Sequence, residues 1–166
     1  MSLKPFLAAL TFTLIYSGAS LAATTAPLPS TLYVGKLGGT FDPERNPAND
    51  LAEAVSQAKA QGKRIIMDVG GEWCVWCLRM DKFMQGDAQI RDTVAADYVW
   101  VKVNYSDENK NEAFLAQYPK VKGYPHLFVL DADGKLLQSE NTSELEQEKS
   151  YSQERFLAFL QKWSGR

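Results

Sequence analysis

Two cysteines three residues apart, placed where a buried strand passes into a helix, restrict the fold of this chain more than any other feature. Arg64 to Val69 is a short apolar run without alternation, which is typical of a central strand buried on both faces. A glycine pair ends that run, and from Cys74 the spacing becomes helical, with Cys77, Met80 and Met84 on one face. The sequence therefore predicts a strand followed by a helix whose first turn carries both cysteines.

Helical periodicity marks several further segments. Asp50 and Glu53 form a capping-box pattern at the start of one helix, and Gly86 is expected to break or kink the helix that begins at Cys74. Ser150 and Gln153 form a similar pattern before the last helix. The predicted helices are Asp50–Gln61, Ala88–Ala96, Asn109–Tyr118 closed by Pro119, and a C-terminal helix with the apolar stripe Phe156, Phe159, Leu160 and Trp163.

Three further strands complete the expected fold. Tyr98–Asn104 is a second apolar run, predicted to be a central strand, and His126–Asp131 is a third. The Asp133-Gly134 turn leads to a fourth strand near Lys135–Gln138, and Ser139–Lys149 is polar and acidic, as in a solvated loop. This order predicts an α/β fold with a central mixed sheet, parallel in the middle and antiparallel at one side, and helices on both faces.

The cysteine pair fits redox chemistry better than the two alternatives. A bond between Cys74 and Cys77 closes almost no loop, so it would add little as a structural staple. A structural zinc site needs four ligands, whereas the chain has two cysteines and one histidine. At a helix N-terminus the thiolate of Cys74 is stabilised, so Cys74 is predicted to attack and Cys77 to resolve the mixed disulfide.

Two charged residues lie in segments predicted to be buried strands. Asp68 lies in the first strand and Lys102 in the second, and a buried charge is costly unless it is paired or neutralised. We expect the two to face each other beneath Cys77, with Asp68 accepting the proton of that thiol. The alternative is that either residue faces solvent at a strand end.

The N-terminus indicates export. A mostly apolar run from Pro5 to Tyr16 and the small residues that follow are typical of a secretory signal peptide cleaved after Ala22 or Ala23. The run is shorter than the ~20 residues of a membrane span, which argues against stable membrane insertion, although an uncleaved anchor is the alternative. We expect a signal peptide at 1–22, a lead-in at 23–45 that contains a short β-like stretch at Leu32–Val34, and one domain at 46–166. The protein is expected in the periplasm or secreted.

Charge excludes one class of partner. The chain has 18 basic and 20 acidic residues, a formal charge of -2, and no basic stripe that would attract a phosphate backbone. Nucleic acid is therefore not an expected partner.

Over roughly Leu51 to Trp163 the sequence resembles the thioredoxin superfamily. The resemblance is most specific at Asp68 to Cys77, where an acidic residue stands six before the first cysteine and Trp73 immediately before it, and at Val121 to Pro125. Cys-x-Trp-Cys followed by Met80 and Phe83 looks like the thioredoxin-like domains of exported bacterial proteins, including thiol:disulfide interchange proteins. Val75 and Trp76 replace the Gly-Pro that thioredoxins have between the cysteines.

This resemblance implies a thioredoxin-like fold and a protein-disulfide oxidoreductase. It implies exchange with protein thiols or disulfides, no bound cofactor or metal, and electrons from a membrane carrier. Lys102 aligns with a lysine of thioredoxins, and together with Asp68 it favours the reductase direction. Pro125 is expected to be a cis proline that presents backbone to substrate.

Other residues near the motif leave two interpretations open. Trp73, Trp76 and Tyr124 could frame an apolar groove for extended substrate, or they could pack around the helix start. His126 could tune or protonate the thiol pair, or it could be a strand-start histidine with a satisfied hydrogen bond. The rival function is a non-catalytic, chaperone-like binding module that grips substrate through the three aromatic residues.

Overall fold

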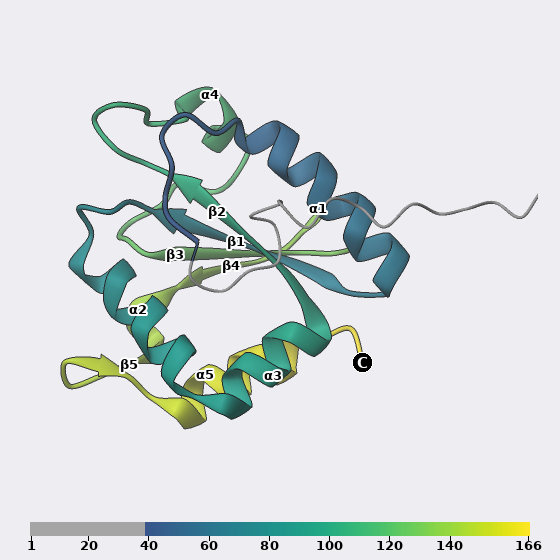
Figure 1. Ribbon diagram of the computed structural model, residues 1–166, viewed down its shortest axis with the longest axis vertical. Coiled ribbons are helices and arrows are strands. Elements are labelled where there is room, and N and C mark those ends of the chain that lie inside the picture. Colours follow the sequence, from purple (N-terminus) through teal and green to yellow (C-terminus); the bar gives the residue numbers. More distant parts are fainter. Residues whose placement is uncertain (1–38) are drawn as a thin grey trace, which may run out of the picture. The chain divides into compact units, whose positions relative to one another are not determined.

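The computed structural model describes residues 39–166, and within them a four-stranded mixed sheet has helices on both faces (Figure 1). Strands β1 and β2 are parallel, whereas β3 pairs antiparallel with both β1 and β4. The strand order is β2-β1-β3-β4. The predicted fold class, with its parallel centre and antiparallel side, is thus confirmed. The strands are β1 Arg64–Gly70, β2 Tyr98–Asn104, β3 His126–Leu130 and β4 Leu136–Asn141.

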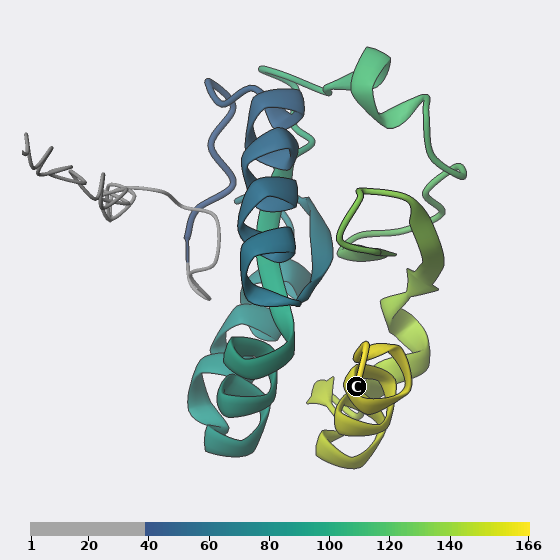
Figure 2. The same cartoon turned by 90° about the vertical axis from the view of Figure 1, so that its right-hand side faces the viewer.

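Alternation along β1 divides the core into two layers. Helix α1 (Pro47–Gln61) packs along β1 and β2 (Figure 2) and covers the face that carries Ile65 and Met67. The opposite face carries Ile66 and is covered by three helices, α2 (Val75–Gly86), α3 (Ala88–Asp97) and α5 (Gln153–Trp163). Because side chains alternate, Asp68 and Gly70 lie on the same face as Ile66, toward α2.

The first helix begins one turn earlier than predicted. Asn46 is its N-cap, and its side chain accepts hydrogen bonds from the backbone of the next turn, at Ala48 and Asn49. Pro47 occupies the first helical position, which proline favours because its missing N–H would have no partner there. Asp50 is not the cap; its carboxylate pairs with the guanidinium of Arg45. The predicted capping box is wrong because an asparagine upstream supplies the same hydrogen bonds.

The predicted break at Gly86 is confirmed. Helix α2 ends at Gly86, and Asp87 caps α3 by accepting a hydrogen bond from the backbone N–H of Ile90 at 3.0 Å.

Strand β2 has the predicted bounds but a different place in the sheet. Within residues 39–166 it pairs only with β1, so it is an edge strand there and not a central one. Its side chains are buried because helices cover both of its faces, and burial of both faces does not require a neighbour at both edges. The β-like stretch expected at 32–34 lies outside the described residues.

Helix α4 (Glu112–Leu115) is much shorter than the predicted Asn109–Tyr118. Asn109 is used as a loop anchor, since its side chain donates to the carbonyl of Pro43 and its own carbonyl accepts from the amide of Asn104. Asn111 has a left-handed backbone (φ 48°) and its amide donates to the carbonyl of Asn104. These bonds hold the chain in a loop where the periodicity alone favours a helix.

The segment after β3 departs most from the prediction. Gly134 occupies the turn with φ 84°, as a left-handed position requires, and β4 continues to Asn141 instead of ending at Gln138. The expected solvated loop at Ser139–Lys149 is wrong: it contains a 3-10 helix, η1 (Thr142–Leu145), and the strand β5 (Glu146–Gln147), and the strand β6 (Ser150–Tyr151) follows directly. Ser152, not Ser150, caps α5. We call residues 142–151 the η1–β6 segment.

Candidate functional site

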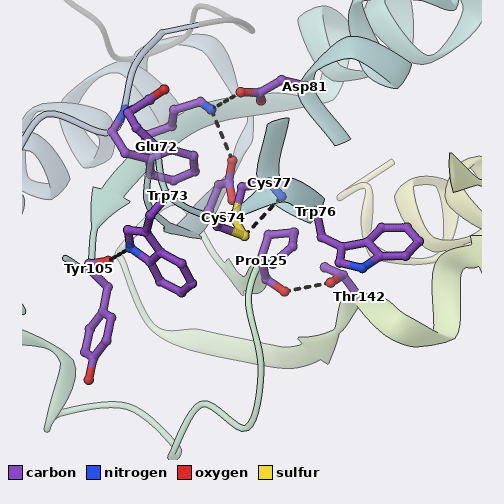
Figure 3. Close-up of a disulfide and its surroundings, with 12 residues drawn as sticks. Glu72, Trp73, Cys74, Trp76, Cys77, Asp81, Tyr105, Pro125 and Thr142 are labelled. Atoms are coloured by element: carbon purple, nitrogen blue, oxygen red, sulfur yellow. Dashed lines mark hydrogen bonds and ion pairs between the residues drawn. A yellow bond between two sulfur atoms is a disulfide. The ribbon is translucent and has the colours of Figure 1, made fainter. Parts of the chain in front are cut away.

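Cys74 and Cys77 form a disulfide at the N-terminus of α2 (Figure 3). Cys74 is the N-cap residue, and its Sγ accepts a hydrogen bond from the backbone N–H of Cys77 at 3.1 Å. The Cα atoms are 5.2 Å apart, Cys74 is 4% exposed and Cys77 is fully buried. The predicted order along the helix is therefore present, with Cys74 at the positive end of the helix dipole and Cys77 one turn inside.

Gly70 and Phe41 shape the space around the buried sulfur. A Cβ atom at Gly70 would lie 2.5 Å from the Sγ of Cys77 and 3.0 Å from the ring of Phe41, so no larger residue fits at the end of β1. Phe41 is 2% exposed and packs with both cysteines, and its backbone N–H donates to the carboxylate of Glu72 at 2.7 Å. Phe41 falls in the segment predicted to be a lead-in, and sequence reasoning missed it.

Asp68 lies two residues before Gly70 on the same face of β1. Its side chain is fully buried, and one oxygen accepts from the indole N–H of Trp100 at 3.3 Å. Burial raises the pKa of Asp68 to about 7, although the ammonium of Lys102 opposes this increase. The other oxygen, Oδ1, has no hydrogen-bond partner within residues 39–166. A carboxyl group with this pKa can take up and release a proton near neutral pH.

Lys102 does face Asp68, but its closer partner is another residue. The strand register places Lys102 directly beside Asp68, with the Nζ 3.8 Å from Oδ2. The same Nζ lies 2.5 Å from the carboxylate of Asp81 on α2 and 3.9 Å from the ring centroid of Phe41. Burial also raises the pKa of Asp81. Sequence reasoning missed Asp81, although an acidic residue four positions after Cys77 lies on the same helical face.

Pro125 joins the site from the loop before β3. The Tyr124–Pro125 peptide bond is cis, and Tyr124 packs against the cluster formed by Phe41 and the two cysteines. The carbonyl oxygen of Pro125 accepts a hydrogen bond from the hydroxyl of Thr142 at 2.6 Å (Figure 3). The η1–β6 segment thus holds the backbone beside the disulfide.

The predicted aromatic residues lie on two sides of the disulfide (Figure 3). Trp73 is 56% exposed, donates its indole N–H to the carbonyl of Tyr105 at 2.7 Å and meets the ring of Tyr124 edge-on at 5.6 Å. Trp76 instead packs edge-on against Tyr151 at 5.8 Å. Trp73 and Tyr124 are therefore together at one side, whereas Trp76 packs against both the η1–β6 segment and the cluster of Phe41 and the two cysteines.

His126 lies on the other face of the sheet from Asp68. Its ring packs against Phe128 at 4.7 Å, and Nε2 shares a hydrogen bond with the hydroxyl of Ser139 at 2.8 Å. Burial lowers the pKa of His126 to about 4, so the ring is neutral near pH 7. Nε2 thus has the hydrogen bond expected of a strand-start histidine, whereas Nδ1 is buried without a partner within residues 39–166.

Residues 39–166 contain neither a metal-binding cluster nor a helix able to span a membrane. No group of three or more histidine, cysteine or acidic residues within 39–166 could hold a metal ion. None of the helices in that range combines the length and apolar character that crossing a membrane requires.

Comparison with known proteins identifies the fold family. A family model described as a thioredoxin-like domain matches residues 51–160. The chain is 32% identical over 95 residues to the disulfide bond reductase DsbH of Chlamydia pneumoniae, covering 52% of this chain and 57% of that protein. It is 26% identical over 87 residues to the thiol:disulfide interchange protein DsbD of Pseudoalteromonas atlantica, covering 52% of this chain and 14% of that protein. The chain thus spans about half of one relative and a seventh of the other.

Solved structures agree on the fold. A disulphide isomerase from Xylella fastidiosa superposes with a TM-score of 0.64 at 22% identity, covering 74% of this chain and 94% of that one. The oxidised C-terminal domain of DsbD from Neisseria meningitidis superposes with a TM-score of 0.54 at 16% identity, covering 71% and 96%. With the family model extending over most of the described residues, the chain belongs to the thioredoxin-like domain family.

Proposed function

We propose that this chain is a thiol:disulfide oxidoreductase that exchanges electrons with protein substrates through Cys74 and Cys77. The observation that carries the proposal is the cysteine pair at the N-terminus of α2, with Cys74 as the cap and Asp68 fully buried on β1. Unpaired N–H groups at a helix start stabilise a thiolate, so Cys74 is the nucleophile of the reduced form.

The exchange proceeds in two steps. The Cys74 thiolate attacks one sulfur of a substrate disulfide, forming a mixed disulfide and releasing the other substrate sulfur as a thiolate. Cys77 then loses its proton and attacks the Sγ of Cys74, which forms the Cys74–Cys77 disulfide and releases the second substrate thiol. The substrate gains two electrons, and a separate dithiol donor must reduce the chain again.

Asp68 is the proposed acceptor for the proton of Cys77. A pKa of about 7 suits this role, because the carboxyl group can accept a proton and return it to solvent near neutral pH. Lys102 holds the carboxylates of Asp68 and Asp81 on either side of its ammonium group. We place Lys102 as a positioning residue, since its charge limits how far burial raises the pKa of Asp68.

We propose the reductase direction, with electrons supplied by a membrane carrier. The combination of Asp68 and Lys102 resembles the reducing thioredoxins, and one relative bears the name disulfide bond reductase. The other relative, DsbD, is named as an interchange protein. On the substrate side, Trp73, Tyr124 and the backbone next to Pro125 form the proposed contact surface.

We propose export to the periplasm or an equivalent compartment after removal of residues 1–22. These residues have the composition of a signal peptide. Mass spectrometry of the native protein from the exported fraction should find an N-terminus near Ala23. A peptide that still contains Lys4 in the membrane fraction would contradict this.

Insulin reduction and trapping of mixed disulfides test the proposed activity. In the presence of a dithiol, the wild-type protein should accelerate the reduction of insulin, and Cys74→Ser should abolish the acceleration. Cys77→Ser should attack but not resolve, so mixed-disulfide complexes should accumulate and disappear on adding reductant. Equal trapping by both variants, or trapping by Cys74→Ser alone, would reverse the assigned roles.

The second candidate is a non-catalytic binding module. The exposed side chains of Trp73, Val75 and Leu78 around the disulfide favour it, because exposed apolar residues in a group mark a binding surface. No turnover of insulin together with no trapping by either cysteine variant would support this alternative.

A further inference from the structure

A groove with an excess of positive charge lies between α2 and the turn that joins β5 to β6. Its lining includes Arg79 and Lys82 from α2 and Lys149 from the turn, and its one acidic residue is Asp87. Asp87 is already engaged, since its carboxylate accepts from the backbone of Ile90 and from the side chain of Gln153. The groove is therefore basic on a chain whose formal charge is -2.

The lysines of this groove have no acidic partner in the described part of the chain. Lys82 and Lys149 are exposed and form no ion pair or hydrogen bond there, and the guanidinium of Arg79 lies over the ring of Trp76 at 4.7 Å. Glu144 and Glu148 are exposed on the same segment but do not line the groove.

The acidic groups nearer the disulfide are all engaged. Asp68 and Asp81 share the ammonium of Lys102, and Glu72 accepts from the backbone of Phe41. Glu72 keeps its negative charge, because its partner is a neutral N–H, and with Asp81 it lines a second hollow that Lys82 also borders. The excess of positive charge therefore belongs to the groove itself, where Arg79, Lys82 and Lys149 face the single acidic residue Asp87.

An apolar strip connects the groove to the disulfide. Val75 is 58% exposed and Leu78 is 44% exposed, and with Lys82 they lie at i, i+3 and i+7 on one face of α2. The outward face of α2 is thus apolar beside the cysteines and basic further along. We call Val75, Leu78, Arg79, Lys82 and Lys149 the α2 docking surface.

We propose that the α2 docking surface binds an extended, acidic segment of a protein partner during disulfide exchange. Apolar side chains beside the cysteine of the partner lie on Val75 and Leu78, and its carboxylates pair with Lys82 and Lys149. The proposal rests on the proposed function and adds the class of partner. Opposite charge on the two surfaces speeds encounter and selects against basic partners.

Helix geometry sets where the acidic residues of the partner must lie. Cys74 and Lys82 are eight positions apart, which is about 12 Å along a helix that rises ~1.5 Å per residue. An extended peptide covers ~3.3 Å per residue, so the matching carboxylates lie about three or four residues from the partner cysteine. Acidic residues directly beside that cysteine would instead meet Val75.

Peptide substrates in three charge states test the proposal. Each is an extended peptide with one cysteine in a mixed disulfide with 2-mercaptoethanol, and carries Asp-Asp, Asn-Asn or Lys-Lys three and four residues from the cysteine on either side. At low salt the reduced protein should react with the Asp-Asp peptide roughly 10-fold faster than with the Lys-Lys peptide. The preference should shrink toward none at 1 M salt, where the screening length falls to ~3 Å.

Charge reversal on the protein provides the matched comparison. The double variant Lys82→Glu with Lys149→Glu should prefer the Lys-Lys peptide, and Lys82→Gln with Lys149→Gln should lose most of the preference. Lys135→Glu is the control: Lys135 is exposed next to the β3–β4 turn, at the end of the sheet away from the disulfide, and should leave the preference unchanged.

Hydroxyethyl disulfide, a small neutral substrate, separates the two proposals. The α2 docking surface is supported if wild type and the charge variants reduce hydroxyethyl disulfide at equal rates while the wild-type protein shows the salt-sensitive preference for the Asp-Asp peptide. If the protein reduces hydroxyethyl disulfide but reacts with all three peptides at equal rates at low salt, the docking surface is overturned and the proposed function stays intact. No reduction of hydroxyethyl disulfide overturns the proposed function and the docking surface with it.

Discussion

At the scale of single residues, Asp68 shows two opposing effects on one carboxyl group. Burial disfavours its charged form, whereas the ammonium of Lys102, 3.8 Å away, favours it, and burial has the larger effect. An exposed aspartate with a pKa of ~3.9 would be deprotonated throughout the physiological range. The pKa of Asp68 is instead about 7, so its carboxyl group changes protonation state near neutral pH, where the Cys77 thiol must lose its proton.

Asp68→Asn is expected to slow the resolution of the mixed disulfide and to leave the first attack by Cys74 nearly unchanged. The amide keeps the shape but cannot accept the proton of Cys77, so resolution at pH 7 should slow toward the lower end of the ~10²–10⁴-fold range of general base catalysis. Rapid-quench detection of the mixed disulfide measures the two steps separately. Wild-type resolution rates in this variant would remove Asp68 from the mechanism.

Asp81→Asn should act in a different way from Asp68→Asn. The negative charge of Asp81 raises the pKa of Asp68, so its removal should lower that pKa and move the midpoint of the pH-rate profile to lower pH. Activity at high pH should persist, because the proton acceptor is still present. A profile with an unshifted midpoint would show that Asp81 does not act through Asp68.

At the scale of elements, the η1–β6 segment connects the two parts of the site. Thr142 at its start donates to the carbonyl of Pro125, and Tyr151 at its end donates to the carbonyl of Trp76 at 3.4 Å. The ring of Tyr151 also packs on Phe83, at 5.8 Å. One segment between β4 and α5 therefore stabilises both the loop before β3 and the cysteine-bearing helix.

Thr142→Val is expected to weaken this connection without changing the volume of the side chain. The carbonyl of Pro125 would be buried without its hydrogen bond, which costs about 1–3 kcal/mol in the free energy of unfolding. Urea unfolding of the oxidised protein measures this loss. Ser143→Ala, one residue away and exposed, is the control that should remain near the wild-type value.

At the scale of the whole molecule, two buried groups give opposite dependences of stability on pH. The pKa of Asp68 rises on folding, so its contribution to stability is present below ~3.9 and is lost as pH rises through about 7. The pKa of His126 falls on folding to about 4, so its contribution is present above ~6.5 and is lost as pH falls toward 4. Neither group alone sets the pH profile.

Replacing Asp68 or His126 singly should show how much each residue contributes to the dependence of stability on pH. Relative to wild type, Asp68→Asn should gain stability as pH rises from 4 to 7, by up to about 4 kcal/mol for a shift of about three pKa units. His126→Gln should gain relative stability as pH falls from 6.5 to 4, since glutamine cannot be charged. Denaturant unfolding of the oxidised proteins at several pH values provides the comparison. Parallel curves for a variant and wild type would rule out a shifted pKa at that residue.

Local sequence patterns determined the features that depend on neighbouring residues along the chain. The apolar run at Arg64–Val69 followed by helical spacing from Cys74 was enough to predict the strand, the helix and the place of both cysteines. Because a buried charge is costly unless it is paired or neutralised, one charge in each of two apolar runs also predicted that Asp68 and Lys102 face each other, and the strand register places them side by side.

Only the tertiary structure decided which distant side chains complete the site. Phe41 comes from an upstream segment and Thr142 from a segment predicted to be a polar loop, and no local pattern connects either of them to the cysteines. Helical spacing does place Asp81 on the face of Cys77, but only the fold brings its carboxylate to Lys102. Periodicity likewise could not show that His126 lies on the opposite face of the sheet. Packing decides such contacts, because it depends on how elements far apart in sequence meet in space.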